Sequence, residues 1–174
     1  MKKALRISLF VLAGLVVAFL GLRAWTKSHS PAHTVMWNQE GLSIKVDYST
    51  PSKKGRVIFG QLVPYGEVWR TGANEATVIE FNQPVTVAGK ALPAGKYSLW
   101  SIPTPAEWTF IFNGETGQWG TNYDAQRDVL RVSVPAAKAT APSEQLDIRF
   151  EQAGAGADLV VQWDNTQVSL PIRK

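Results

Sequence analysis

Apolar and polar residues alternate along most of the chain from residue 42 onward. In the first such segment, Leu42, Ile44, Val46 and Tyr48 share one side of an extended chain, and polar residues separate them. A period of two is typical of a β-strand with one buried face. Six further segments are expected to form long strands: 77–81, 108–112, 130–134, 146–150, 159–163 and 168–172. Three segments are expected to form shorter strands: 57–59, 85–87 and 97–102.

Short turns that contain Gly, Pro or Asn separate these segments, for example at 82–84, 93–95 and 154–156. Connections of this length leave no room for crossover helices, so neighbouring strands are expected to pair antiparallel. A sheet with one apolar face must bury that face. The sequence therefore predicts an all-β domain: an antiparallel β-sandwich of about nine or ten strands, with a jelly-roll as one candidate topology. Only residues 121–128 are expected to form a helical turn.

An apolar run without charges extends from Ile7 to Leu22, ahead of the alternating part. As a helix it is about 24 Å long, and the residues up to position 26 extend it toward the roughly 30 Å of a membrane core. We expect residues 7–26 to be one hydrophobic helix that anchors the chain in a lipid bilayer. A cleaved signal peptide is the alternative, although small residues are poorly placed for cleavage after Ala24.

Charges around this run indicate its orientation. Three basic residues precede the run and two follow it, so the N-terminus is expected in the cytoplasm and the domain in the periplasm or outside the cell. The expected organisation is a basic cytoplasmic flank (1–6), the anchor or signal segment (7–26), a linker (27–36) and the β domain (37–174). A cleaved, secreted form is the alternative location.

Composition removes several classes of function. Five of the 18 basic residues and none of the 14 acidic residues lie in residues 1–33, so the domain itself is nearly neutral and nucleic acid is a poor partner. The chain has no cysteine, and its two histidines, His29 and His33, flank Pro31 in the linker. Catalytic triads that need cysteine or histidine are thereby excluded from the domain. Metal centres whose ligands are cysteine or histidine are excluded as well. We expect no cofactor, no metal site and no assignable catalytic residue.

Two polar loops are the candidate binding segments. The 60–76 loop is long for a segment without regular structure, which is uncommon unless the loop has a function. Within it, Arg70 is suited to hold a carboxylate or phosphate. Alternatively, it braces the loop by pairing with Glu75 or another acid and by satisfying loop carbonyls. A second loop spans 113–128, and the sequence does not show whether the two loops meet. The ligand-binding candidates are Tyr65, Trp69, Arg70, Asn74, Glu75, Trp119, Tyr123 and Asp128.

Four of the tryptophans fall into two groups, those in alternating segments and those in the polar loops. Trp108 and Trp163 are in phase with apolar neighbours and are expected in the core. Trp69 and Trp119 lie in the polar loops, where they either fill an open end of the domain or stack on a ligand.

Several motifs resemble the bacterial domain-of-unknown-function family 2911. They include Leu62-Val63-Pro64-Tyr65-Gly66, Leu92-Pro93-Ala94-Gly95-Lys96-Tyr97 and, most specifically, Trp69-Arg70-Thr71-Gly72-Ala73-Asn74-Glu75. The resemblance covers about residues 42–172. It implies an exported bacterial domain of β-sandwich type, without an established reaction, substrate or cofactor. Family members often look like secreted proteins whose signal peptide is cleaved. The resemblance therefore favours a cleaved signal peptide over a retained anchor.

We therefore expect a non-catalytic, membrane-anchored module that binds a ligand or partner of the bacterial envelope through the 60–76 and 113–128 loops. One alternative is a carboxylate-dependent hydrolase of envelope glycans or another polar substrate, because such an enzyme needs only two acidic residues. A second alternative is a structural subunit of an envelope complex.

Overall fold

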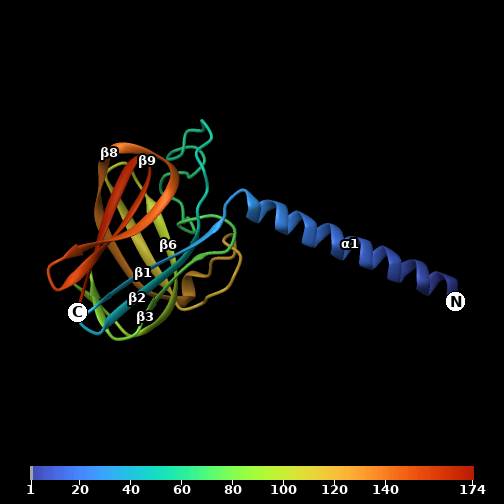
Figure 1. Cartoon of the computed structure of the whole chain (residues 1–174), viewed down its shortest axis with the longest axis horizontal. Coiled ribbons are helices and arrows are strands. Elements are labelled where there is room, and N and C mark those ends of the chain that lie inside the picture. Colours follow the sequence, from blue (N-terminus) through green and yellow to red (C-terminus); the bar gives the residue numbers. More distant parts are fainter. Residues whose placement is uncertain (1) are drawn as a thin grey trace.

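The computed structural model describes residues 2–174, including all side chains except those of residues 2–8 and 24. A long N-terminal helix leads into an antiparallel β domain (Figure 1). The elements are α1 (Lys2–Ser28), β1 (Ala32–Gln39), β2 (Leu42–Ser49), β3 (Thr77–Phe81), β4 (Val85–Val87), β5 (Lys90–Leu92), β6 (Gly95–Pro103), β7 (Glu107–Asn113), the short 3-10 helix η1 (Ala125–Arg127), β8 (Asp128–Ala153) and β9 (Gly156–Arg173).

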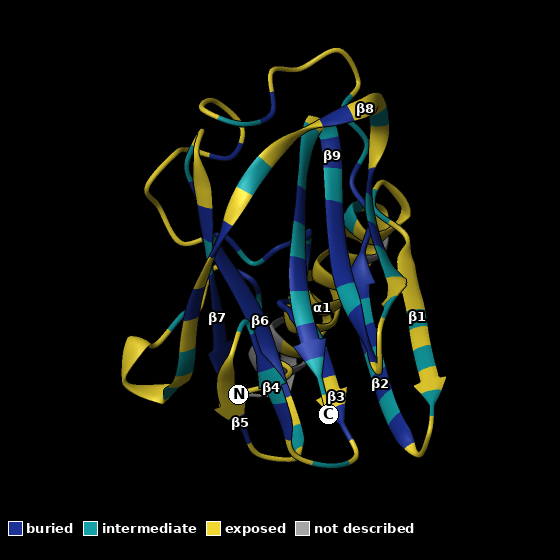
Figure 2. Ribbon diagram, turned by 90° about the vertical axis from the view of Figure 1, so that its left-hand side faces the viewer, coloured by how far each residue is buried: buried dark blue, intermediate teal, exposed yellow. Residues whose placement is uncertain are grey.

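The strands form one nine-stranded sheet in the order β1-β2-β3-β6-β7-β8-β9-β4-β5. Every pairing between them is antiparallel. The long strand β8 joins the two parts of the sheet, because its first part pairs with β7 and its later part pairs with β9 (Figure 2). The predicted all-β, antiparallel domain after one hydrophobic helix is confirmed. Its division into two stacked sheets of jelly-roll type stays a prediction.

Several strand boundaries differ from those expected from the sequence. The segments 130–134 and 146–150 belong to the single strand β8, and 159–163 and 168–172 belong to β9. Strand β1 starts inside the expected linker. It is an edge strand with no fully buried residue, so its sequence lacks a clear alternation. The expected short strand at 57–59 is instead a turn, closed by a hydrogen bond from the Gly60 amide to the Val63 carbonyl.

The core contains a group of aromatic rings. Trp108 and Trp163 are each 1% exposed, which confirms their predicted place in the core. The rings of Trp69 and Trp163 stack with centroids 6.1 Å apart, and the Phe59 ring meets Trp108 edge-on at 5.0 Å. Trp100 lies in a second, smaller cluster with Ala76 and Ile111. The large aromatic group therefore forms the wall against which the 60–76 loop packs.

The two core tryptophans differ in the hydrogen bonding of their indole nitrogens, which predicts different costs of replacement. Trp163 Nε1 donates to the Glu144 carbonyl at 3.3 Å, whereas Trp108 Nε1 is buried without a partner. Trp163→Phe loses a hydrogen bond, while Trp108→Phe removes an unsatisfied donor that costs about 1–3 kcal/mol. We expect Trp163→Phe to lower the free energy of unfolding by about 1–2 kcal/mol more than Trp108→Phe does. Urea unfolding followed by far-ultraviolet circular dichroism checks this, and equal losses would contradict it.

Candidate functional site

The two polar loops meet at the side of the domain from which α1 emerges (Figure 1). The Gly120 amide donates to the Asn74 carbonyl at 2.9 Å, and the Ala76 amide donates to the Gln118 carbonyl at 3.2 Å. Glu75 and Trp119 face each other across this short antiparallel bridge. The structure therefore brings Arg70, Asn74, Glu75 and Trp119 together, although they come from segments about 45 residues apart.

Gly120 is the point of closest approach between the loops. Arg70 Nη1 donates to the Gly120 carbonyl at 3.2 Å, and the stem of the arginine crosses directly over the glycine. A Cβ atom at position 120 would overlap the Arg70 Cδ and would lie 2.7 Å from the Asn74 carbonyl oxygen. Only glycine leaves room for the arginine in this position.

Arg70 has no acidic partner among the described side chains. Burial lowers the pKa of its guanidinium, which nevertheless stays charged at neutral pH. Its Nε atom is buried without a hydrogen bond, and no carboxylate among the described side chains forms an ion pair with it. Arg70 therefore does not pair with Glu75, although its hydrogen bond to the Gly120 carbonyl braces the loops as the structural alternative expected. An unpaired, partly buried cation is costly, and it is a good candidate for holding an anion.

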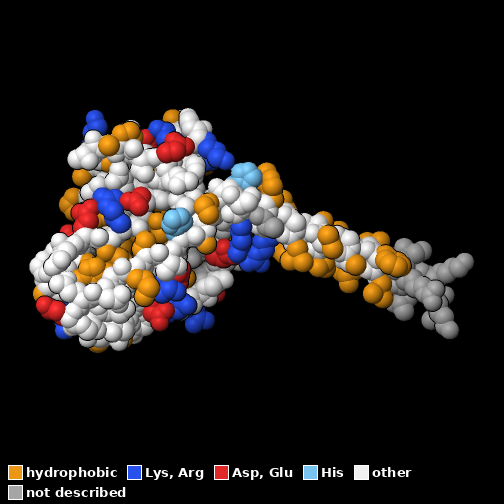
Figure 3. Space-filling view, viewed as in Figure 1, with side chains coloured by type: hydrophobic (Ala, Val, Ile, Leu, Met, Phe, Trp, Pro, Cys, Tyr) orange, Lys and Arg blue, Asp and Glu red, His pale blue; other side chains and the backbone are white. Residues whose placement is uncertain are grey.

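Glu75 pairs instead with the end of α1. Its Oε1 atom accepts from Arg23 Nη2 at 2.9 Å and from Lys27 Nζ at 2.7 Å. Partial burial opposes the charged carboxylate, but the hydrogen bonds from Lys27 and Arg23 outweigh it and hold the pKa of Glu75 below its ordinary value. In Figure 3, basic and acidic side chains gather where α1 meets the domain. Glu75 thus connects the helix to the polar loops.

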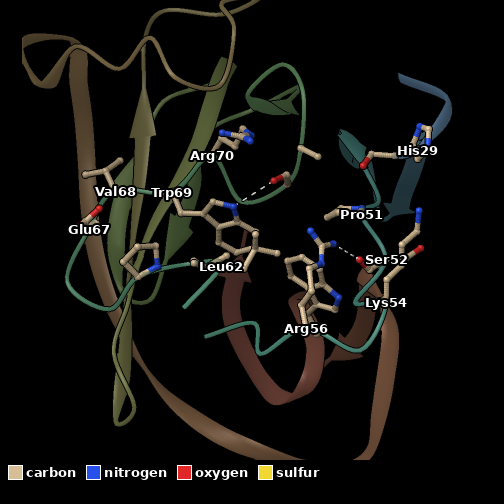
Figure 4. A pocket seen from close by; sticks show the side chains of 16 residues that line it. His29, Pro51, Ser52, Lys54, Arg56, Leu62, Glu67, Val68, Trp69 and Arg70 are labelled. Atoms are coloured by element: carbon tan, nitrogen blue, oxygen red, sulfur yellow. Dashed lines mark hydrogen bonds between the residues drawn. The ribbon is translucent and has the colours of Figure 1, made fainter. Parts of the chain in front are cut away.

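A cavity of about 570 Å³ opens beside Arg70. Trp69 lies between Arg70 and Arg56 on its wall (Figure 4). Lys54 also lines the cavity, so three cationic side chains oppose one acidic side chain, Glu67. The lining thus combines an apolar wall with an excess of positive charge.

Trp69 is a wall of the cavity rather than an exposed stacking surface. It is 9% exposed, and its indole nitrogen donates to the Gly72 carbonyl at 3.2 Å. Of the two alternatives for this side chain, the structure favours filling the open end of the core. Leu62, Val63 and Trp163 extend the same apolar wall.

Asn74 and Tyr65 have structural surroundings. Asn74 Nδ2 donates to the Ser30 carbonyl at 3.2 Å, and thereby ties the 60–76 loop to the segment that follows α1. Tyr65 does not line the cavity, and its ring packs over Gly60, where a Cβ atom would lie 2.9 Å from it.

Tyr123 and Asp128 belong to a network away from the cavity. Asp128 accepts hydrogen bonds from Tyr123 Oη at 2.7 Å, from Arg131 Nη2 at 2.7 Å and from Asn113 Nδ2 at 2.9 Å. Burial, followed by the hydrogen bond to Asp128, raises the pKa of Tyr123 to about 12. The phenol therefore stays neutral and the network closes the 113–128 loop. Trp119 is the one aromatic side chain of this loop that contacts α1, with Arg23 5.6 Å from its ring centroid.

The sequence did not single out Lys54 or Arg56 as site residues, whereas Glu67 was a candidate carboxylate for the hydrolase alternative. Lys54 and Arg56 lie in the 51–59 segment, which was expected to lead into a short strand. The basic sequence Lys53-Lys54-Gly55-Arg56 interrupts the alternating pattern just before the polar loop. This interruption is the feature of the sequence that could have indicated Lys54 and Arg56.

A family model described as a protein of unknown function (DUF2911) matches residues 30–172. The chain belongs to this family. The match confirms the resemblance carried by the Trp69–Glu75 motif, and it starts at Ser30, directly after α1. The DUF2911 region thus contains the sheet except for Arg173, the last residue of β9, and the lining of the cavity except for His29. No curated protein and no solved structure matches the chain.

The crossing of Arg70 over Gly120 predicts that this DUF2911 domain tolerates no side chain at position 120. Gly120→Ala should lower the free energy of unfolding by about 1–3 kcal/mol, because the methyl group displaces Arg70 or the Asn74 carbonyl. The matched control is Gly114→Ala in the same loop, where the nearest atom lies 3.5 Å away and a change within about 0.5 kcal/mol is expected. Chemical unfolding of both variants decides, and similar losses would rule out the crowded crossing.

The lowered pKa of Glu75 predicts that acid releases α1 from the domain. A carboxylate with a lowered pKa stabilises the contact fully above the ordinary glutamate pKa of about 4.3, and this stabilisation is lost as the pH falls through the lower, folded-state pKa. A nitroxide on Thr121→Cys should therefore become more mobile below about pH 4 in its EPR spectrum. In a Glu75→Gln background the mobility should be high already at pH 7 and should not change with pH. A pH dependence that survives Glu75→Gln would show that another group is responsible.

Proposed function

We propose that this DUF2911 protein is a membrane-anchored module that binds an anionic ligand with an apolar body in the cavity beside Arg70. The observation that carries the proposal is the guanidinium of Arg70, which is half-buried in a cation-rich lining and has no acidic partner among the described side chains. A carboxylate or phosphate would supply the missing charge and accept two parallel hydrogen bonds from the guanidinium.

The apolar wall indicates what is attached to the anionic group. Trp69, Trp163 and Leu62 are apolar members of the cavity lining beside the cations, and Leu62 is the most exposed of the three. Ligand sites commonly combine such walls with a few polar groups that fix the orientation of the ligand. The proposed ligand is therefore amphipathic, with its anionic end at Arg70 and its apolar or aromatic part against Trp69.

The membrane anchorage rests on α1. Within Leu9–Ser28, a window of 18 residues has a mean hydropathy of 2.0, and none of this window is buried against the domain. As a helix, the uncharged run Ile7–Leu22 is about 24 Å long, and the residues up to position 26 extend it toward the roughly 30 Å of a bilayer's hydrocarbon core. With the cytoplasmic orientation expected for the basic N-terminus, the domain would lie in the periplasm or outside the cell.

A binding role accounts for Glu75 and Asp128, two of the candidate carboxylates, better than hydrolysis does. Hydrolysis by two carboxylates requires one of them to have a raised pKa, so that it acts as an acid. Glu75 has a lowered pKa and two basic partners, and Asp128 is held by three side chains. Both acidic groups therefore serve to hold the loops together.

The test is a thermal-shift measurement with phenyl phosphate, benzoate and N-acetylmuramic acid as anionic probes and benzyl alcohol as the neutral probe. A probe that binds the native state stabilises it by about 2.7 kcal/mol at a hundred times its Kd, which raises the melting temperature. Wild-type protein should respond to at least one anionic probe and not to benzyl alcohol. Arg70→Ala should lose the response, and Arg70→Lys should weaken it because lysine cannot form the paired hydrogen bonds.

The matched control is Arg127→Ala, which removes an exposed arginine of the 113–128 loop that does not line the cavity. This variant should respond as the wild type does. A folded Arg70→Ala protein that keeps the full response would overturn the proposal, as would a wild-type protein that responds equally to the neutral probe.

A further inference from the structure

We infer that the 113–128 loop forms a second contact with the lipid bilayer, with Trp119 in the interfacial region at the outer end of α1. This inference rests on the proposed membrane anchorage and is independent of the ligand proposed for the cavity. It extends the contact of the protein with the membrane from the helix to the folded domain.

Trp119 lies beside the helix within its apolar segment. Together with Phe19, Leu22, Arg23 and Thr26, it lines a mainly apolar groove of about 360 Å³. The Arg23 guanidinium lies over its indole ring, with Arg23 Cζ 5.6 Å from the ring centroid. All four helical residues belong to the segment Leu9–Ser28, which is long and apolar enough to cross a membrane. A helix inserted over this segment therefore brings Trp119 to the bilayer.

The depth of Trp119 follows from the helix rise of 1.5 Å per residue. Arg23 is the first charged residue after the apolar run, so it marks the edge of the hydrocarbon region. Phe19 lies about 6 Å below this level and Thr26 about 4.5 Å above it. Trp119 lines the same groove as both residues and so lies near the boundary between the acyl chains and the headgroups. Tryptophan is enriched at this depth in membrane proteins.

The charges near Trp119 are compatible with this position. The carboxylate of Glu75 lies across the loop bridge from Trp119 and is paired with both Arg23 and Lys27. Paired in this way, Glu75 does not bring an isolated negative charge to the membrane surface. The long stems of Arg23 and Lys27 also allow their charged ends to reach the headgroups.

The connection between helix and domain is too short to let the domain move away from the membrane. Only residues 29–31 separate α1 from β1, and hydrogen bonds fix them at two points. The Ser30 carbonyl accepts from Asn74 Nδ2 at 3.2 Å, and the Pro31 carbonyl accepts from the Thr50 amide at 2.9 Å. The domain is thereby held with its polar loops toward the bilayer.

The absence of native cysteine makes a single-label depth measurement direct. Full-length chains with one nitroxide each, at Leu15→Cys in α1, at Thr121→Cys beside Trp119 or at Asn38→Cys at the distant end of β1, are placed in vesicles of phosphatidylethanolamine and phosphatidylglycerol. The EPR accessibility of each label to oxygen, relative to a water-soluble nickel chelate, increases with depth. We expect the highest ratio at position 15, the lowest at position 38, and an intermediate ratio at position 121.

Variants of Trp119 show whether the indole is responsible. In the Thr121→Cys background, Trp119→Ala should shift the ratio at position 121 toward that at position 38. Trp119→Tyr should preserve the intermediate ratio, because tyrosine also favours the membrane interface. A fall in the ratio caused by Trp119→Ala, with position 15 unchanged, supports the contact.

The outcomes separate this inference from the proposed anchor. If the label at position 15 lies in the hydrocarbon but position 121 matches position 38, the loop contact is overturned and the anchor stands. If position 15 is accessible to the nickel chelate, or the chain is recovered as a shorter soluble product, both the anchor and the loop contact are overturned. Binding of the anionic probes at Arg70 is measured separately and is not affected by either result.

Discussion

The packing of Arg70 against Gly120 is the contact on which the functional end of this domain depends. The two polar loops are distant in sequence, and the bridge between Asn74 and Gly120 holds them together where the arginine crosses the glycine. This crossing fixes the arginine stem and leaves the end of its side chain at the cavity wall. A side chain at position 120 would move the loops apart and would also displace the cation.

The fixed position of Arg70 explains why the neighbouring acidic residues do not neutralise it. Asp128 is occupied by Tyr123, Arg131 and Asn113, and Glu75 is occupied by the two basic residues at the end of α1. Glu75 and Asp128 thus have structural partners and do not line the cavity, where Glu67 is the acidic side chain among the described residues. The positive charge that remains beside Trp69 is a consequence of this division among the loop residues, and an anion that enters the cavity would meet it without displacing an internal partner.

The sequence predicts most of the sheet because alternation with a period of two reports directly on burial. Strand β1 escaped prediction because an edge strand such as Ala32–Gln39 buries no face completely. The separate segments 130–134 and 146–150 looked like two strands, since β8 loses its regular pairing between them and passes from one partner to the next. The meeting of the loops was beyond prediction because local patterns contain no information about contacts between residues 74 and 120. The expected pairing of Arg70 with Glu75 failed for the same reason, since the true partners of Glu75 lie about 50 residues earlier in the chain.

The N-terminal leader, whether it is a retained anchor or a cleaved signal peptide, lies next to the candidate site. His29 and Ser30, the first residues after α1, already line the cavity, so the cavity opens within a few residues of the apolar segment. In the proposed membrane-anchored form, the Arg70 cavity would lie close to the headgroup region of the bilayer. For a chain that loses its leader, Glu75 loses both basic partners and becomes a free carboxylate near Arg70 and Trp119. Retention of the helix therefore affects the charge of the loop surface as well as the location of the domain. With the helix present, Arg23 and Lys27 neutralise Glu75, and without it Glu75 carries an unpaired negative charge.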